Sequence, residues 1–124
     1  MDEFEDGSQA VIGAAIEVHR ILGPGLLESI YQRALCRELA LREIVFQSQA
    51  PVPVNYKGVD LGDDLRLDIV IPKMLVVEIK AADRIHPIHE AQLLTYLKLT
   101  GIRSGLLINF NVRYLKEGLK RMAN

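Results

Sequence analysis

The chain has 124 residues, of which 49% are hydrophobic and 25% charged, with a formal net charge of −1. This length and composition argue against a disordered chain and against a fold that needs metal or disulfide staples. No apolar run approaches the roughly 20 residues of a membrane span. The acidic start MDEFEDGSQ is unlike a secretory signal, and the single cysteine excludes an internal disulfide. We expect a cytoplasmic protein with one domain over residues 1–124, in which residues 1–7 are frayed or disordered.

Two helices are predicted in the first part of the chain. Ser8 is expected to be the N-cap of the first helix, and the GPG at 23–25 ends it. A second helix is expected over residues 26–42, where Cys36 is interpreted as a small apolar core residue. The apolar residues at helical spacing, expected to face the core, are Val11, Ala14, Ala15, Val18 and Leu22 in the first helix and Leu27, Ile30, Ala34, Leu35 and Leu39 in the second.

Extended structure is predicted after Ile44. The two prolines of APVPV favour a strand at the edge of a sheet, because proline donates no ladder hydrogen bond. NYKG at 55–58 is typical of a turn. The runs LRLDIVI and MLVVEIK, separated by Pro72-Lys73, predict an antiparallel hairpin of largely buried strands.

The last part of the chain is predicted to contain a helix and one or two strands. A helix over residues 88–100 ends at Gly101, and SGLLINF forms a strand. VRYLKEGLKRM fits either a turn with a short strand or a helix interrupted at Gly118, and the strand is preferred. The residues expected on the inner side of the helix are Ala91, Leu94, Leu97 and Lys98 or Leu99.

These elements give the order α-α-β-β-β-α-β, with a possible final strand. The expected class is α/β (α+β), with one mixed central sheet flanked by helices. The helix between the third and fourth strands acts as a crossover, so those two strands should pair in parallel.

Positive charge gathers toward the end of the chain. Residues 1–50 carry four basic and eight acidic side chains, a net −4, whereas residues 51–124 carry eleven and eight, a net +3. This asymmetry is weaker than the signature of a dedicated nucleic-acid-binding protein. The residues of the tail that are candidates for phosphate contacts are Arg113, Lys116, Lys120 and Arg121.

Charged side chains occur in the otherwise apolar predicted hairpin. Glu78 and Lys80 point to the same face of their strand because side chains alternate. A hairpin centred on Lys73 places Asp68 directly opposite Glu78, although a register error of one residue would destroy this arrangement. Opposed carboxylates repel each other. Either a divalent cation such as Mg²⁺ or Mn²⁺ lies between them, or Lys80 forms a simple salt bridge at the strand end.

Asp68 followed by Glu78-Ile79-Lys80 resembles the D…(D/E)-x-K signature of the PD-(D/E)xK nuclease superfamily. The predicted order of elements also matches the common restriction-endonuclease-like core of that superfamily. Leu67 stands where the superfamily's name has proline, but that proline is often missing. The whole chain is therefore interpreted as one PD-(D/E)xK nuclease-like domain.

Two further stretches narrow the resemblance. GPGLLESIY contains Gly25-x-x-Glu28-x-x-Tyr31, and AQLLTYL contains Gln92-x-x-x-Tyr96. Together with LLINF, they resemble the small prokaryotic family of GxxExxY proteins, which is assigned to the same superfamily. The resemblance covers about residues 12–121.

The resemblance implies a catalytic set. Asp68 and Glu78 correspond to the metal-binding carboxylates, the main-chain carbonyl of Ile79 to a further metal ligand, and Lys80 to the catalytic lysine. Glu28 corresponds to an acidic residue on the first core helix that completes or supports the metal site.

The resemblance also concerns residues on the neighbouring helices. Gln92 belongs to the implied catalytic set and resembles the glutamine that contacts the lysine, water or phosphate, whereas Tyr31, Tyr96 and His89 have supporting roles. Tyr31 and Tyr96 share helix faces with Glu28 and Gln92, although both rings could simply pack in the core. His89 is three residues before Gln92 and could approach the substrate. A metal triad with His19 and His86 is less favoured than capping or supporting roles for the histidines.

The leading hypothesis is a metal-dependent nuclease, most plausibly a DNA endonuclease, with Mg²⁺ or Mn²⁺ as cofactor and DNA favoured over RNA. The alternative is a module that binds nucleic acid or assembles with proteins on a nuclease fold without catalysis. A hydrolase of another phosphate ester is a third hypothesis, without a specific signal. The short chain leaves little room for sequence recognition, so a homodimer or a partner protein could supply specificity.

Overall fold

The computed structural model describes residues 5–124, and its elements follow the predicted order. The helices are α1 (Ser8–Leu22), α2 (Glu28–Leu41), α3 (Pro87–Thr100) and the short 3-10 helix η1 (Leu115–Gly118). The strands are β1 (Gln47–Val52), β2 (Asn55–Tyr56), β3 (Val59–Asp60), β4 (Leu65–Ile71), β5 (Leu75–Lys80), β6 (Ser104–Asn109) and β7 (Leu119–Ala123). Within residues 5–124, no helix combines the length and apolar character needed to cross a membrane.

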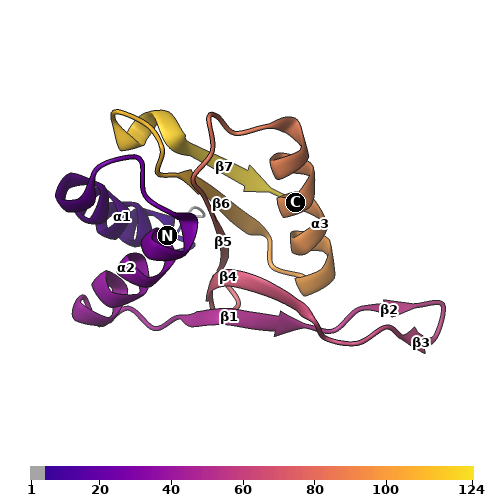
Figure 1. The fold of residues 1–124 in the computed structure, drawn as a ribbon. Coiled ribbons are helices and arrows are strands. Elements are labelled where there is room, and N and C mark those ends of the chain that lie inside the picture. The colour runs from indigo at the N-terminus through magenta and orange to yellow at the C-terminus, as the bar shows by residue number, and fades with distance from the viewer. Residues whose placement is uncertain (1–4) are drawn as a thin grey trace.

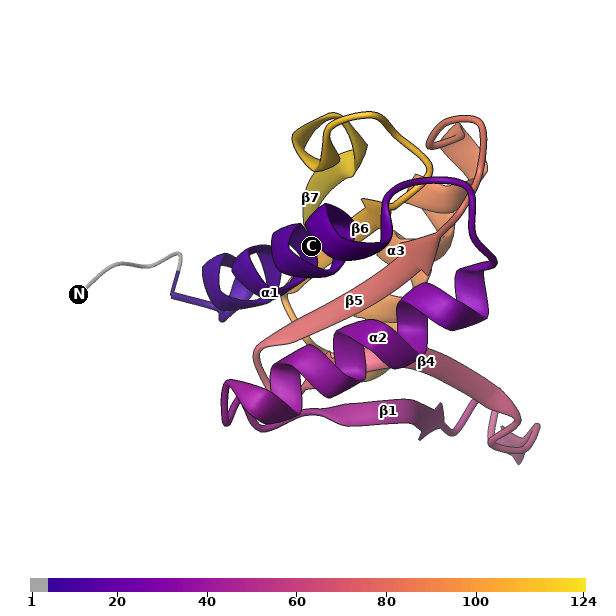
Figure 2. The same cartoon turned by 60° about the vertical axis from the view of Figure 1, so that its left-hand side comes forward.

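Five of the strands form a mixed sheet in the order β1-β4-β5-β6-β7. β5 and β6 pair in parallel, and the other neighbours are antiparallel. The parallel pair is the one connected through α3, which confirms the predicted crossover. The strand after Ile44, β1, lies at the sheet edge as its prolines indicated. Helices α1 and α2 cover one face of the sheet and α3 covers the other (Figure 1 and Figure 2).

The sheet separates two apolar clusters. The cluster on the side of α1 and α2 includes Val11, Val18, Tyr31, Leu35, Leu39, Ile69, Val77, Ile79 and Phe110. The cluster on the side of α3 includes Val70, Val76, Leu93, Leu97 and Leu107. Cys36 packs at the margin of the first cluster, in agreement with the prediction for this residue. β5, with apolar neighbours on both faces, is the rigid centre of the fold.

The start of α1 differs from the prediction. Ser8 is not the N-cap, because Gly7 takes that position with a left-handed φ of 86°. Asp6 Oδ1 accepts a 2.8 Å hydrogen bond from the Ser8 amide, while the Ser8 side chain is buried. Asp6 thus supplies the side-chain oxygen at the start of α1 that was expected from the Ser8 hydroxyl. Of residues 1–7, which were expected to be frayed, residues 1–4 lie outside the described part of the chain.

Some helical faces were also assigned wrongly. Leu22 and Leu27 are exposed, since they lie at the junction of α1 and α2 rather than over the sheet. On α3 the buried residues are Leu93 and Leu97, while Ala91 and Leu99 are exposed. Because α3 carries apolar residues on several sides, its periodicity does not identify the side that packs.

Two segments refine the prediction. The NYKG turn is confirmed at Lys57-Gly58, but β2 and β3 flank it and form a small hairpin that projects from the body (Figure 1). At the other end of the sequence η1 precedes β7, so the preferred strand is confirmed. Gly118 is the last residue of η1, and no larger residue fits there because a Cβ would collide with the main-chain carbonyl oxygen of Asn109.

Candidate active site

The β4–β5 hairpin has the register that the sequence predicted. Ile69 pairs with Val77 and Ile71 with Leu75. Beyond the Ile69–Val77 pair the regular ladder is replaced by two side-chain bonds. The Asp68 amide donates to Glu78 Oε2 at 3.0 Å, and the Ile79 amide donates to Asp68 Oδ2 at 2.8 Å. Each carboxylate is therefore held by the backbone of the opposite strand.

Burial disfavours the ionised form of both carboxylates, Asp68 and Glu78. Glu78 is only 5% exposed, and desolvation, with repulsion from Asp68 as the second cause, raises its pKa to about 8. Burial also raises the pKa of Asp68, although hydrogen bonds from Ile79 and Gln49 and the charge of Lys80 oppose that shift. The end of the hairpin thus concentrates two acidic groups whose negative charge the surrounding protein only partly offsets.

Lys80 is held by a neutral partner on α3. Its Nζ donates a 3.2 Å hydrogen bond to Gln92 Oε1. Among residues 5–124, no ion pair joins Lys80 to Asp68 or Glu78. The alternative of a simple salt bridge at the strand end is therefore wrong, and the ammonium group stands beside the carboxylates without being tied to them.

Glu28 approaches the same region from the first residue of α2. Partial desolvation raises the pKa of its carboxyl group, whereas the charge of Lys80 and a hydrogen bond to the Ala81 backbone oppose the shift. Repulsion from Asp68 contributes to the rise. The structure therefore brings Glu28 near the hairpin carboxylates, as the motif implied.

Tyr31 explains the rest of the GxxExxY stretch. Its ring is fully buried and stacks on Phe110 with centroids 4.6 Å apart. Its hydroxyl donates to the carbonyl of Gly23 at 2.5 Å and accepts from the amide of Leu26 at 3.1 Å. Tyr31 is thus a core residue whose hydroxyl holds the loop in front of Glu28.

Helix α3 faces the site with polar side chains three and four residues apart, which is the spacing of one helix side. Gln92 contacts Lys80 directly. Desolvation raises the pKa of Tyr96, with the charges of Glu78 and Asp68 as further causes. Desolvation and the nearby charge of Lys80 lower the pKa of His89. Gln92, predicted in the catalytic set, and the two supporting residues expected on α3, His89 and Tyr96, therefore lie in the neighbourhood of the hairpin end.

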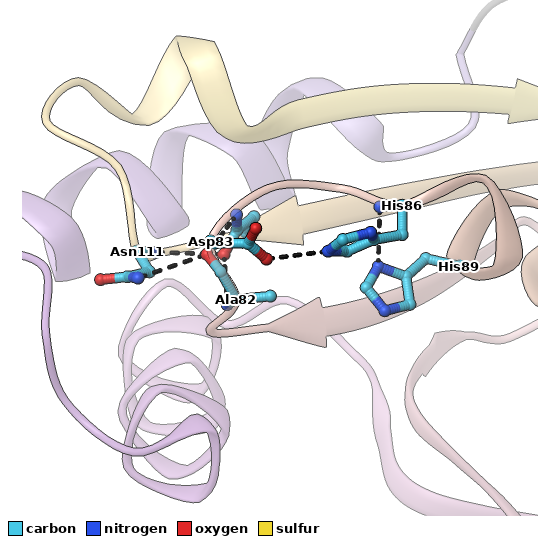
Figure 3. Close-up of polar contacts among 6 residues, drawn as sticks. Ala82, Asp83, His86, His89 and Asn111 are labelled. Atoms are coloured by element: carbon cyan, nitrogen blue, oxygen red, sulfur yellow. Dashed lines mark hydrogen bonds and ion pairs between the residues drawn. The ribbon is translucent and has the colours of Figure 1, made fainter.

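The loop after Lys80 is held by a polar network (Figure 3). His86 Nε2 contacts Asp83 Oδ1 at 2.8 Å, and the His86 amide donates to His89 Nδ1 at 3.1 Å at the start of α3. Asn109 and Asn111 both donate side-chain hydrogen bonds to the Ala82 carbonyl. The histidines of this loop thus cap α3, which confirms the preference for capping over a metal triad. His19 lies elsewhere, donating from Nε2 to the Val112 carbonyl at 2.7 Å.

The sequence interpretation missed two residues that shape the site. Gln32 is buried and its Nε2 donates to the Asp68 carbonyl at 2.7 Å and to Ser48 Oγ at 3.2 Å. Gln49 donates a side-chain hydrogen bond to Asp68 from a left-handed backbone position with φ 51°. Gln32 follows Glu28 by one helical turn, and that spacing was the available signal.

A family model described as the PD-(D/E)XK nuclease superfamily matches residues 5–122. The chain belongs to this superfamily. The match does not extend to the narrower GxxExxY resemblance, which stays a prediction. No curated protein and no solved structure matches the chain significantly. Membership suggests a hydrolytic nuclease, and the mixed sheet with helices on both faces is consistent with a restriction-endonuclease-like fold.

For a member of this superfamily, the donor set at the hairpin end suits a hard divalent cation. Asp68 and Glu78 offer buried carboxylate oxygens whose repulsion a cation would remove. Within residues 5–124 no three His, Cys, Asp or Glu side chains form a metal-binding group. The predicted set of Glu28, Asp68 and Glu78 is therefore not found as one three-residue cluster, and the fit rests on the carboxylates of Asp68 and Glu78.

The basic residues of the tail are dispersed over the superfamily fold. Arg113 and Lys116 line a cavity beside α1. Lys120, on β7, pairs with Glu90 of α3 at 3.5 Å, and Arg121 lines a separate depression at the sheet edge. These four residues do not form one continuous patch.

Proposed function

We propose that this chain is a metal-dependent nuclease that hydrolyses phosphodiester bonds in DNA. The observation that carries the proposal is the pair of carboxylates, Asp68 and Glu78, each bound by the opposite strand's backbone and accompanied by Lys80. Membership of the nuclease superfamily supports the same reaction class.

Asp68, Glu78 and the main-chain carbonyl of Ile79 would hold Mg²⁺ or Mn²⁺, and Glu28 would complete the site through water. Such an ion polarises a scissile phosphate and makes a bound water a better nucleophile at neutral pH. The raised pKa of Glu78 is expected in a carboxylate that awaits a cation, because a positive charge there would favour the ionised form.

Lys80 would supply the positive charge of the site. Because it is hydrogen-bonded to Gln92 and not neutralised by a carboxylate, its ammonium can hold an attacking water or offset charge that develops on the phosphate. Gln92 acts on the reaction by orienting Lys80. Glu78 and Asp68 keep their geometry through backbone amides, so they need little reorganisation during a turnover.

The preference for DNA over RNA, a cytoplasmic location and a homodimer or partner protein that supplies specificity belong to the same proposal. They rest on the family resemblance, the single cysteine and the small size of the chain.

The test is a cleavage assay with single- and double-stranded DNA and RNA in the presence of Mg²⁺ or Mn²⁺. Lys80→Ala should lower the cleavage rate by about 100-fold or more, the effect of removing one charge-stabilising donor. Lys98→Ala, which changes an exposed lysine of α3, is the matched control. Equal rates for wild type and Lys80→Ala would refute the catalytic assignment.

Calorimetric titration with Mn²⁺ distinguishes the nuclease from the non-catalytic binding module. A nuclease site should bind Mn²⁺ with Asp68 and Glu78 intact and lose that binding in Glu78→Gln. A wild-type protein that binds DNA but shows no metal affinity and no cleavage would favour a binding module.

A further inference from the structure

One cavity of the described chain lies apart from the hairpin carboxylates, since neither Asp68 nor Glu78 lines it. It has a volume of about 510 Å³ and lies between the end of α1, the loop before α2 and the segment that contains η1. This volume is within the range of small-molecule and nucleotide sites. Its apolar wall includes Ile16, Pro24 and Leu115.

The polar part of this cavity is basic. Arg20 is neutralised by Glu17, to which it donates two hydrogen bonds of 2.8 and 2.9 Å. Arg113 and Lys116 also line the cavity, and neither forms an ion pair within residues 5–124. The cavity therefore presents two unneutralised cations beside an apolar wall, a combination that suits an anionic ligand with a flat apolar part.

Tyr114 adds a stacking surface to the cavity. The residue is 54% exposed, and the Arg113 guanidinium lies 5.1 Å from the centre of its ring. Exposed aromatic rings next to basic groups bind unpaired bases by stacking while the cations contact phosphates. An exposed tyrosine has no packing reason to lie here, because its ring is not part of either core cluster.

The cavity is connected to the candidate active site by the backbone. The Phe110 amide donates to the Lys80 carbonyl at 3.0 Å, and Asn111 Nδ2 donates to the Ala82 carbonyl at 3.3 Å. After Val112, Arg113 and Tyr114 follow in the chain. The segment that leads into the cavity is thus anchored to Lys80, the last residue of β5, and to Ala82, whose contact with Asn111 is drawn in Figure 3.

We infer that this cavity binds an unpaired nucleotide of the substrate that flanks the scissile phosphate, with Tyr114 stacking on the base and Arg113 and Lys116 contacting phosphates. The inference rests on the proposed nuclease function and adds a single-stranded segment to the substrate it acts on. Duplex DNA without an unpaired end lacks a base that could enter the cavity.

Binding is measured by fluorescence anisotropy with a short fluorescein-labelled single-stranded DNA in EDTA, where no cleavage occurs. Tyr114→Ala should weaken binding by about 5- to 100-fold, as expected for the loss of one stacked base, and Tyr114→Phe should restore it. Lys116→Ala should lower the slope of log affinity against log salt by about one.

The β2–β3 hairpin offers a matched control. Tyr56 is 60% exposed, and Lys57 Nζ lies 5.4 Å from the centre of its ring. Tyr56→Ala therefore removes an equivalent tyrosine–cation pair that does not line the cavity. Unchanged binding by Tyr114→Ala, or an equal loss in Tyr56→Ala, would overturn the inference. If Tyr114→Ala lost as much affinity for a blunt duplex as for the single strand, the inference that the cavity takes an unpaired base would be refuted.

The two proposals fail separately. If the wild type cleaves DNA and Tyr114→Ala binds normally, only the nucleotide cavity is refuted. If Tyr114→Ala loses binding but the wild type never cleaves, the nuclease proposal fails, and the cavity is then a binding site without a reaction.

Discussion

The two halves of the β4–β5 hairpin are built differently. Near the turn, Ile69, Val70 and Ile71 pair regularly with Val77, Val76 and Leu75 in a dry, apolar ladder. At the other end, ladder bonds are replaced by two bonds in which the amides of Asp68 and Ile79 donate to the carboxylates of Glu78 and Asp68. One pair of strands thus contains a half optimised for packing and a half that places charge.

The difference shows how a small fold can carry a buried acidic pair. The apolar half fixes the register and direction of both strands, and the polar half then uses the same register to hold two oxygens in place. The cost of the polar half is visible in the raised pKa of Glu78, whereas the apolar half has no titratable group.

The largest expected effect comes from breaking the polar half. Asp68→Asn should reduce metal-dependent cleavage by about 100-fold or more, because a neutral amide removes one of the two carboxylates that would hold the ion. Cleavage rates at saturating Mn²⁺ measure this effect. Asp64→Asn, at an exposed position before β4, should cleave like the wild type. Full activity of Asp68→Asn would remove Asp68 from the site.

Glu78→Gln tests the polar half of the hairpin through the pH dependence of the free energy of unfolding. The folded-state pKa of Glu78, about 8, exceeds the 4.5 of the unfolded chain, so the native state holds the proton more tightly. Its contribution to the free energy of unfolding is therefore complete below about pH 4.5 and is lost as pH rises to about 8. In EDTA, Glu78→Gln should be more stable than wild type by about 2 to 4 kcal/mol at pH 9.

Urea unfolding at pH 5 and pH 9 measures this difference. Part of the pH dependence should persist in Glu78→Gln, since the pKa values of Asp68 and Glu28 are also raised. Identical pH profiles for variant and wild type would show that Glu78 is not the group whose burial is costly.

A change in the apolar half should behave in the opposite way. Val76→Ala removes buried methyl groups and should lower the free energy of unfolding by about 2 kcal/mol at both pH values. Urea unfolding again provides the measurement. A pH-dependent loss would mean that the two halves of the hairpin are not energetically distinct.

The smallest expected effect concerns the support of Asp68 from α2. Gln32→Leu removes the 2.7 Å bond to the Asp68 carbonyl, but it also removes the buried Gln32 Oε1, which has no partner. These changes oppose each other, so a net loss of about 1 kcal/mol is expected. Thermal unfolding measures it, with Gln9→Leu on the exposed side of α1 as control. A loss of several kcal/mol would show that Gln32 supports more than one carbonyl.

The sequence was most informative where local chemistry decides the structure. The Pro72-Lys73 turn predicted the hairpin register, and the bonds that link Asp68 with Glu78 and Ile79 lie directly beyond the paired residues. The glycines after α1 and α3 marked the helix ends. These features depend on residues close in sequence, and so does the crossover that makes β5 and β6 parallel.

Features that depend on tertiary contacts were harder to predict. The partner of Gln32 lies 36 positions away, and no periodicity connects the two residues. The packed side of α3 is set by the shape of the sheet, because Ile88 and Leu99 are as apolar as the buried leucines. Gly7 takes the N-cap position expected for Ser8, and the carboxylate of Asp6 accepts the hydrogen bond of the Ser8 amide.

The carboxylate–amide bonds of Asp68 and Ile79 also give the protein built-in spectroscopic reporters. Their two N–H groups donate to side-chain carboxylates, whereas ordinary strand amides donate to main-chain carbonyls. An ion that draws Glu78 Oε2 or Asp68 Oδ2 toward itself should therefore shift the resonances of these two amides first and alter their exchange rates. The resonances and exchange rates of the Val76 and Val77 amides, which belong to the regular ladder of β5, should stay unchanged.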